Sequence, residues 1–354
     1  MRSDRANHAV VTGGAGFIGT NVTSRLVEDG AEVVVLDNLS RPGVERNLRW
    51  LLESYGDRVR FEQADICDRE ALRRILPGAR TVVHLAAQVA VTTSLDSPLD
   101  DFRINAMGTL TLLEELRRLE HAPFLLFTST NKVYGALPQL SLELEGLRWL
   151  PIDATLRAHG LSEREPLDFC TPYGCSKGAA DQYVLDYAKS YGLPAVVFRM
   201  SCIYGPHQHG TEDQGWVAHF AIKALHGEPV TLYGDGAQVR DILFVEDLVE
   251  AMMLARDHVD VTAGRPFNMG GGAENAVSLL EVLEQLADLN GRPSAVRFEA
   301  ERAGDQRYYV ADTERFRTAT GWRPTVGARE GVERLASWLA DEHADEHALR
   351  AVAR

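Results

Sequence analysis

The sequence has few cysteines, no excess of positive charge and no long apolar run. Its four cysteines are Cys67, Cys170, Cys175 and Cys202. They show neither the paired spacing of zinc ligands nor the density of a disulfide framework, which favours a reducing compartment, the cytoplasm. The 37 Lys and Arg residues are outnumbered by 51 Asp and Glu residues, and the formal net charge of -14 argues against a surface that coats nucleic acid.

Signals for a membrane, for secretion or for a metal are equally scarce. Residues 1–8 are polar and lack the apolar centre of a signal peptide, and no later stretch is apolar over the length of a membrane span. His207 and His209 could suggest a metal site, but no carboxylate or cysteine partner has suitable spacing. We therefore expect a soluble protein without a metal, and we place these histidines in a loop over its site.

Short apolar runs alternate with amphipathic stretches through the first 200 residues. The apolar runs are residues 8–14, 31–38, 60–66, 81–88, 122–130 and 194–200. Between them, stretches such as 17–30, 105–119 and 174–192 have the period of helices. This alternation predicts an α/β fold with a Rossmann-like, doubly wound parallel sheet.

The pattern loosens after about Tyr204, where strand-like pieces at 228–234, 240–248 and 266–271 stand among helices. This indicates a smaller C-terminal substrate-binding lobe that is interleaved with returns to the main sheet. We expect the Rossmann-like domain to cover residues 1–200 with 240–262 returning to it, and the lobe to cover 201–239 and 263–340. Residues 341–354 are charged and rich in alanine, which is typical of a solvated helix or a frayed tail.

Glycines mark the first strand-to-helix turn, where residues 10–19 are VVTGGAGFIG. At Gly13, Gly16 and Gly19 the missing side chains let the backbone turn tightly and let a pyrophosphate approach the helix N-terminus. The structural alternative is a glycine-rich turn that merely packs a helix on a strand. The strand, loop and helix context favours dinucleotide binding.

Asp37 closes the second strand, 18 residues after Gly19. A carboxylate at this place can accept hydrogen bonds from both hydroxyls of an adenosine ribose, and it would repel a 2′-phosphate. Arg41 is a nearby guanidinium that could accommodate that phosphate. Because Asp37 stands at the strand end itself, we predict NAD rather than NADP as the cofactor.

Tyr173 and Lys177 are four residues apart at the start of a helix, so both side chains project from one face. A phenol with a pKa of about 10 is a poor base near neutrality, but an adjacent ammonium and an oxidised nicotinamide both favour the phenolate. Thr130 ends the strand 122–130 and would hold the same substrate oxygen through its hydroxyl. A Tyr-x-x-x-Lys pair alone is usually an exposed helix face, but with the glycine turn, Asp37 and Thr130 it indicates a catalytic site.

These residues resemble the extended short-chain dehydrogenase/reductase family along essentially the whole chain, from TGGAGFIG at 12–19 to GWRP at 321–324. Further segments are similar to its CDP-paratose 2-epimerase branch, also called CDP-tyvelose epimerase. They are STNKVYG (129–135), TPYGCSKGAADQYVLDYA (171–188), DQGWV (213–217), GAQVRD (236–241), GDQRYYVAD (304–312), DNLSRPG (37–43) and HLAAQVAVTTSLD (84–96). The resemblance implies an NAD-dependent isomerase that inverts carbon 2 of a CDP-hexose through a transient keto sugar, and a homodimer or homotetramer.

The resemblance also implies the residues of the site, with Thr130, Tyr173 and Lys177 as the catalytic ones. The residues implied for NAD are Gly13, Gly16, Phe17, Ile18, Gly19, Asp37, Asn38, Asp65, Ile66, Ala86, Gln88, Asn105, Tyr173 and Lys177. The residues implied for the nucleotide sugar are Gln88, Thr130, Asn131, Ser201, Cys202, Arg240, Arg302 and Asp305. Dehydratase and 4-epimerase relatives usually have an asparagine where Cys202 stands, and since a thiol is a weak donor, Arg240 would carry more of the anchoring.

The arginines of the C-terminal half are expected at the anionic end of the substrate. Arg240, together with Arg302 and Arg307 around Asp305, would bind the diphosphate and ribose, because guanidinium groups match phosphate oxygens. A surface salt bridge is the alternative for each arginine.

Asn131 and Lys132 stand where nucleotide-sugar 4,6-dehydratases, which this chain also resembles, carry an Asp-Glu pair. An amide cannot donate a proton like a carboxylic acid, and an ammonium is normally protonated at neutral pH, so the elimination of water is not expected. The structural alternatives are a turn-forming asparagine and a solvated lysine.

Two other functions fit parts of the pattern. A 4-epimerase or decarboxylase of another nucleotide sugar would share the base chemistry, and products from CDP-, UDP- and GDP-sugars would distinguish it. A non-catalytic dinucleotide sensor or scaffold would keep the fold without the chemistry, but Tyr173 and Lys177 are both present.

Overall fold

The computed structural model describes residues 8–302 and 304–352, with side chains placed up to residue 342. A seven-stranded parallel sheet in the order β12-β8-β5-β4-β1-β2-β3 forms its centre. These strands are β1 His8–Thr12, β2 Glu32–Asp37, β3 Val59–Gln63, β4 Ala79–His84, β5 Phe124–Thr130, β8 Ala195–Met200 and β12 Pro266–Met269. The predicted Rossmann-like α/β fold is confirmed.

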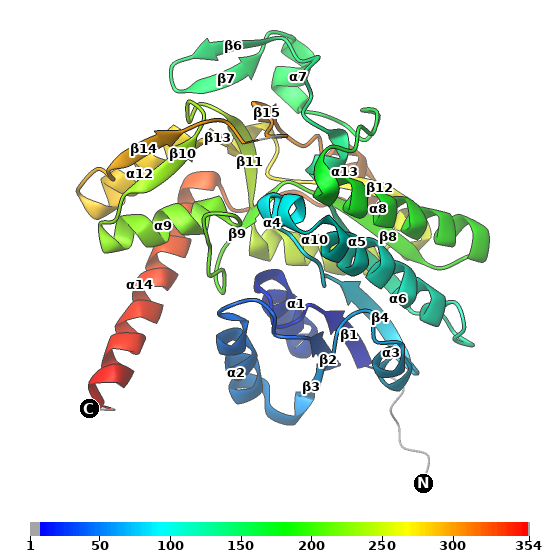
Figure 1. Cartoon of the computed structure of the whole chain (residues 1–354). Coiled ribbons are helices and arrows are strands. Elements are labelled where there is room, and N and C mark those ends of the chain that lie inside the picture. The colour runs from blue at the N-terminus through cyan, green and yellow to red at the C-terminus, as the bar shows by residue number, and fades with distance from the viewer. Residues whose placement is uncertain (1–7, 303, 353–354) are drawn as a thin grey trace.

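Helices cover both faces of this sheet (Figure 1). On one face lie α1 Phe17–Glu28, α2 Val44–Tyr55, α10 Val245–Asp257 and α13 Glu314–Thr320. On the other face lie α3 Arg69–Ile75, α6 Gly108–Leu116 and α8 Thr171–Tyr191. Successive residues of a strand point to opposite faces of the sheet. Val11 packs in the core under α1, α2, α10 and α13, and Val10 packs in the core under α3, α6 and α8. This period-two burial explains why the strands have near-continuous apolar sequences.

Shorter elements connect these layers. They are α4 Val91–Asp96, α5 Pro98–Phe102, the π-helical turn Arg103–Met107, α11 Val259–Thr262 and the 3₁₀ turns Gly56–Arg58, Asn131–Tyr134 and Ala273–Asn275. The turn Asn131–Tyr134 follows β5 directly, and the side chain of Thr130 accepts a hydrogen bond from the Lys132 amide at its start. The residues after Thr130 are therefore held close to the carboxyl end of the sheet.

The smaller lobe packs at this carboxyl end. Its strands are β9 Cys202–Tyr204, β10 Val230–Tyr233, β11 Val239–Phe244, β13 Ala276–Ser278, β14 Val296–Glu299 and β15 Tyr308–Tyr309. Its helices are α9 Trp216–His226, α12 Leu279–Asn290 and α14 Ala328–Val352, which share one apolar core with β9, β10 and β11. A hairpin of β6 Leu142–Glu145 and β7 Arg148–Pro151, followed by α7 Ala154–His159, stands at the top of Figure 1.

The domain boundaries predicted from the sequence need two corrections. The returning segment was expected at 240–262, but β11 pairs with β9, β13 and β15 of the lobe, and the packing of this segment on the main sheet comes from α10 together with Leu243 and Val259. The strand that joins the main sheet is β12, inside the segment 263–340 that was assigned to the lobe. Residues 242–244 of β11 are apolar like those of a central strand, and the sequence does not reveal that the buried Arg240 and Asp241 pair with β13 in the lobe. Helix α14 continues through residues 341–352 of the predicted tail.

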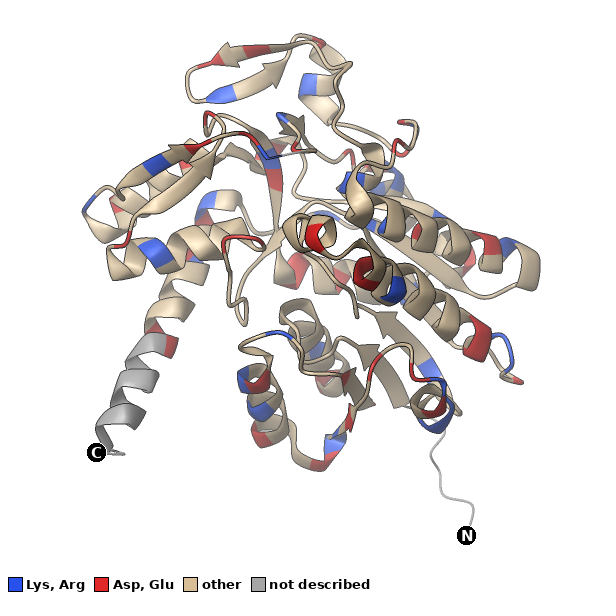
Figure 2. Cartoon of the chain, in the orientation of Figure 1, with Lys and Arg blue, Asp and Glu red and all other residues tan. Residues whose placement is uncertain are grey.

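The surface charges and the hydropathy of the helices are those expected of helices that cover a central sheet. Figure 2 shows acidic and basic residues mixed along the outer helices, without a basic patch on the face in view. Among the described residues, no helix has the combination of length and apolar sequence that a bilayer span requires.

Candidate active site

A cavity of about 650 Å³ lies where the central sheet meets the lobe. It is lined by the glycine turn, by the ends of β2 and β5, by the start of α8 and by residues 200–217 of the lobe. Ligands of open α/β sheets bind at this carboxyl end of the strands. The cavity therefore has the position expected for both a dinucleotide and a substrate.

The glycine turn is shaped for close approach of a phosphate. Gly13 has a φ of +69°, and a Cβ atom there would lie 2.7 Å from the Ala86 nitrogen. A Cβ atom on Gly19 would lie 2.3 Å from the Gly13 carbonyl oxygen. Helix α1 begins at Phe17 after Gly16, which offers no side-chain cap, so the first amides of the helix are available to a pyrophosphate. The backbone packing of the turn thus explains Gly13 and Gly19, and the free amides at the start of α1 fit a dinucleotide.

Asp37 ends β2 at the edge of the cavity and is held in place by backbone amides. Its carboxylate accepts hydrogen bonds from Ala15 at 3.2 Å and Leu39 at 2.9 Å. Burial raises the pKa of Asp37, while these bonds and the charge of Arg41 lower it. Arg41 Nη2 donates to Gln214 Oε1 at 2.6 Å, so this guanidinium is engaged with the lobe. Both observations fit NAD, whose ribose offers hydroxyls instead of a 2′-phosphate.

Most of the other residues predicted for NAD line the same cavity. They are Phe17, Ile18, Asn38, Asp65, Ile66, Ala86 and Gln88. Asn105 is an exception, since it is buried and lies behind Gln88. Its amide receives a bond from the Gln88 nitrogen at 2.9 Å and donates one to the Gln88 carbonyl at 3.0 Å. The direct contact predicted for Asn105 is therefore corrected to a supporting role.

Tyr173 and Thr130 meet inside the cavity as the sequence predicted. Pro172 starts α8, and this places Tyr173 in the first turn of the helix. Burial raises the pKa of Tyr173 to about 12 against a smaller lowering by the neighbouring Thr130 side chain, whose hydroxyl donates to Asn131 Oδ1 at 3.3 Å. The protein's own groups thus hold Tyr173 as the neutral phenol.

Lys177 differs from the expectation. Its ammonium donates to the Thr128 carbonyl oxygen at 2.6 Å and lies 4.3 Å from the centre of the Phe127 ring. Burial lowers the pKa of Lys177 to about 7. Because the ammonium is bound to the end of β5, the phenolate-favouring effect expected from Lys177 does not appear in this arrangement.

Asn131 and Lys132 both bind the segment 304–306 of the lobe. Asn131 Nδ2 donates to Gln306 Oε1 at 3.0 Å. Lys132 Nζ lies 3.2 Å from the Gly304 carbonyl and 3.3 Å from Asp305 Oδ1, and its side chain is only 20% exposed. The alternative of a solvated lysine is therefore wrong. The sequence analysis did not find Gln306, because a buried glutamine carries no recognisable spacing.

Arg240 faces the same segment. Its Nη2 atom donates to Asp305 Oδ1 at 2.7 Å, and the charges of Arg240 and Lys132 lower the pKa of Asp305. Ser201 and Cys202 line the cavity nearby, and the Cys202 sulfur accepts a bond from Trp216 Nε1 at 3.3 Å. Of these three charged residues, Lys132 lines the cavity, and Arg240 and Asp305 do not.

The other two arginines lie elsewhere. Arg302 stacks 3.7 Å from the centre of the Tyr233 ring and lies 3.6 Å from Asp213. Arg307 is 57% exposed and pairs with Glu301 at 3.1 Å, which matches the surface salt bridge left open from the sequence. Neither Arg302 nor Arg307 lines the cavity.

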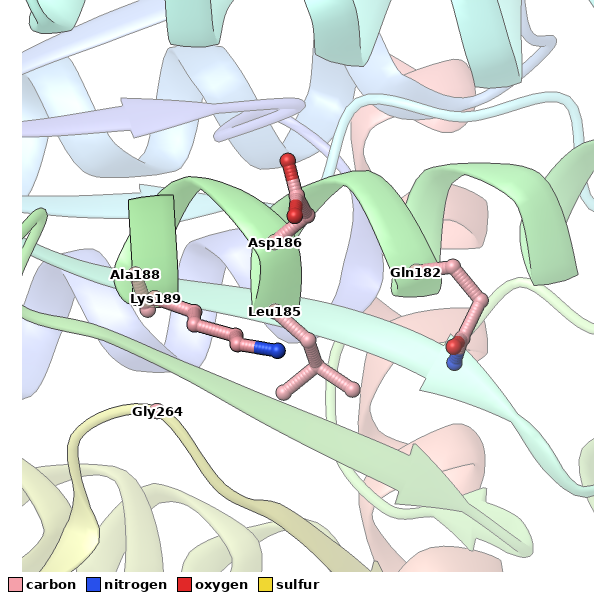
Figure 3. Close-up of a pocket in the computed structure, with 6 residues that line it drawn as sticks. All are labelled: Gln182, Leu185, Asp186, Ala188, Lys189 and Gly264. Atoms are coloured by element: carbon pink, nitrogen blue, oxygen red, sulfur yellow. The ribbon is translucent and has the colours of Figure 1, made fainter. Parts of the chain in front are cut away.

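A second recess of about 450 Å³ lies along α8 (Figure 3). Its lining consists of Gln182, Leu185, Asp186, Ala188, Lys189 and Gly264. None of these is a predicted site residue, and Asp186 points away from Gly264 in the view shown. This recess carries no catalytic constellation.

The fold, the glycine turn, Asp37 and the Thr130–Tyr173–Lys177 group define an NAD-dependent enzyme of the Rossmann class. A family model described as NAD dependent epimerase/dehydratase matches residues 9–270. The chain belongs to this epimerase/dehydratase family.

Individual relatives match nearly the whole chain. CDP-paratose 2-epimerase of Salmonella typhi is 41% identical over 338 residues, which cover 94% of this chain and 98% of the relative. The structure of UDP-glucose 4-epimerase from Thermotoga maritima with UDP-glucose has a TM-score of 0.81 at 31% identity and covers 95% of this chain and 99% of that one. UDP-glucose 4-epimerase of Thermus thermophilus, solved with NAD, has a TM-score of 0.76 at 34% identity and covers 94% and 98% of the two chains.

Proposed function

We propose that the protein inverts carbon 2 of a CDP-hexose, with CDP-paratose and CDP-tyvelose as the favoured pair. The 41% identity to a CDP-paratose 2-epimerase over 94% of the chain is the observation that carries this proposal. When bound, NAD would supply the acceptor and donor for the hydrogen of the sugar carbon, so the overall reaction would be redox-neutral.

The residues of the site have separate tasks in this proposal. Tyr173 takes the proton of the sugar hydroxyl and returns it after the keto sugar has presented its other face, and the positive charge of an oxidised nicotinamide, when NAD is bound, would favour the phenolate that this step needs. Thr130 lies beside Tyr173 in the cavity and holds the same oxygen through its hydroxyl. Lys177 fixes the helix start to β5 through Thr128 and places a positive charge beside the cofactor site when it is protonated. Arg240 and Lys132 supply positive charge for the diphosphate sugar on an otherwise acidic protein.

The surroundings of Thr130 support epimerisation over dehydration. Removal of water needs an acid and a base beside the keto sugar. Asn131 is an amide bound to Gln306, and Lys132 is bound to Gly304 and Asp305. Neither residue is a carboxylic acid, so this place lacks the Asp-Glu pair of the dehydratases.

An activity screen tests the proposal directly. Purified protein is incubated with CDP-, UDP- and GDP-hexoses, and the products are separated and identified by NMR. We expect inversion at carbon 2 of CDP-sugars without added NADH. Inversion at carbon 4 of UDP-glucose would instead show that the protein is a UDP-glucose 4-epimerase, like the Thermotoga maritima enzyme. Loss of carbon dioxide from a uronic acid would show that it is a decarboxylase.

We propose further that the protein is a homodimer. Leu99, Phe102, Met107 and Tyr183 are exposed by 84, 50, 47 and 44%. They lie on α5, the following π-helical turn and α8, which pack side by side (Figure 1). Large apolar side chains on neighbouring helices favour burial against a second copy of the chain. Light scattering should give twice the monomer mass of 39.1 kDa, or four times that mass for the tetramer that was also predicted.

The compartment we propose is the cytoplasm. All four cysteines are free thiols, and Cys175 is exposed. Free thiols persist most readily where glutathione and thioredoxin keep them reduced. Fractionation of cells that express the tagged protein would test the compartment.

A further inference from the structure

Residues 205–215 connect β9 to α9 and form part of the wall of the 650 Å³ cavity. We call them the histidine loop, because they contain His207 and His209. The glycine turn and Asp37 line the same cavity. The histidine loop belongs to the lobe in sequence, yet it lies against the helices that carry the glycine turn.

Asn47 joins the two segments. This residue of α2 is buried, with an exposed fraction of 3%. Its Nδ2 atom donates to the carbonyl oxygen of Ala15 in the glycine turn at 3.2 Å and to that of His207 in the histidine loop at 3.1 Å. Its Oδ1 atom lies 3.3 Å from His209 Nε2. One amide side chain thus uses both its donors and its acceptor to connect the two segments.

Three other contacts also hold the histidine loop against α1, α2 and the segment between β2 and α2. Asn21 Nδ2 donates to the Pro206 carbonyl at 3.0 Å, and Arg41 donates to Gln214 at 2.6 Å. The Trp50 ring lies 4.4 Å from the His207 ring. Asn21 also donates to the carbonyl oxygen of Phe17 at the start of α1, whereas Asn47 reaches Ala15 between Gly13 and Gly16.

We propose that Asn47 is a positioning residue for NAD, which fixes the histidine loop at the spacing from the glycine turn that the bound cofactor requires. Asn47 acts through the two backbone segments and does not take part in proton transfer. Release of NAD then requires these hydrogen bonds to break, so Asn47 slows its dissociation. This inference concerns the cofactor alone and does not depend on which sugar is the substrate.

The test compares Asn47→Ala with Asn275→Ala. Asn275 is also buried, with an exposed fraction of 6%, and bonds the backbone of Val326 and Ala328 outside the cavity. Loss of NAD from each purified protein is followed by rapid gel filtration and by exchange against isotope-labelled NAD. Asn47→Ala should release NAD about tenfold faster, as expected for two lost backbone hydrogen bonds. Asn275→Ala should release it at the wild-type rate.

A second variant keeps the inference testable if Asn47→Ala folds poorly. Trp50 is 37% exposed, so Trp50→Ala removes the ring contact with His207 without opening the core. It should also speed NAD release by about threefold, because the free energy of one aromatic contact corresponds to a change of this size. At saturating NAD, both variants should keep the wild-type kcat. Unchanged NAD release in both variants, or a lower kcat at saturating NAD with unchanged release, would overturn the proposal.

Discussion

Lys177 Nζ donates a 2.6 Å hydrogen bond to the carbonyl oxygen of Thr128, two residues before Thr130. The bond ties helix α8 to the end of β5, and it fixes the relative position of Tyr173 and Thr130. Since Lys177 is buried, its pKa falls to about 7 from the ordinary value of 10.5. The protonation of Lys177 therefore affects the free energy of unfolding as well as the charge in the site.

Lys177→Met should flatten the pH dependence of stability above pH 7. Between a pKa of about 7 in the folded protein and 10.5 in the unfolded chain, only the unfolded chain keeps the proton. The free energy of unfolding therefore rises with pH in this window, by up to about 1.4 kcal/mol per pH unit, and this gain is lost as the pH falls to 7. Urea denaturation at about pH 7.5 and about pH 9 measures the slope.

Lys189→Met is the control for this experiment, since Lys189 is exposed on the same helix. Its slope should equal that of the wild type. Equal slopes for the wild type and Lys177→Met would show that Lys177 keeps its ordinary pKa in the folded protein.

Tyr173→Phe should lower kcat by about a hundredfold to ten-thousandfold, because it removes the proton carrier. The NAD content should stay near the wild-type value, since the ring remains. Thr130→Val should lower kcat less, because Tyr173 keeps its hydroxyl. Tyr191→Phe, at the exposed end of α8 and outside the proposed dimer face, is the matched control and should be fully active. If Tyr173→Phe kept more than about a tenth of the activity, proton transfer would belong to another group.

Asp37 should determine which dinucleotide the protein carries. Chromatography of the supernatant after denaturation should show NAD or NADH, because the carboxylate at the cavity edge repels a 2′-phosphate. Asp37→Ser should weaken NAD binding and narrow its advantage over NADP. NADP as the main species from the wild-type protein would contradict the role assigned to Asp37 and would point to Arg41.

Arg240→Gln should raise KM for the nucleotide sugar by about tenfold or more with a smaller change in kcat, because a charged hydrogen bond contributes about 1.5–3 kcal/mol. The variant also leaves Asp305 with Lys132 as its remaining cation. Arg307→Gln removes an exposed arginine two residues after Asp305 and should leave KM unchanged. Equal effects of the two substitutions would indicate a general charge effect instead of a specific contact.

The sequence predicted the parallel main sheet and the NAD cofactor, because their signals are local. Alternating apolar strands and helices, the glycine spacing and Asp37 each depend on residues that are near one another in the chain. The lobe was harder, since β11 contains Arg240 and Asp241 although it is buried, β12 has only four residues, and neither sequence reveals which sheet the strand joins. Contacts such as Lys132 with Asp305 or Asn47 with His207 join residues that are far apart in the chain, and no local pattern predicts them.

The isotopic fate of the hydrogen on carbon 2 separates the proposed chemistry from its main rival. In the proposed reaction this hydrogen leaves carbon 2 without mixing with solvent, because Tyr173 exchanges only the hydroxyl proton. A deuterium atom placed on carbon 2 of a CDP-hexose should therefore remain on carbon 2 of the epimer. The measurement is NMR or mass spectrometry of the purified product.

The reverse labelling experiment completes the argument. Unlabelled substrate turned over in heavy water should acquire no deuterium at carbon 2, since no side chain removes a proton from that carbon. Epimerisation by proton abstraction beside a ketone would need such a base, and it would introduce solvent deuterium at the inverted carbon. Deuterium at carbon 2 from solvent, or inversion at carbon 4 alone, would require a different assignment of the reacting carbon.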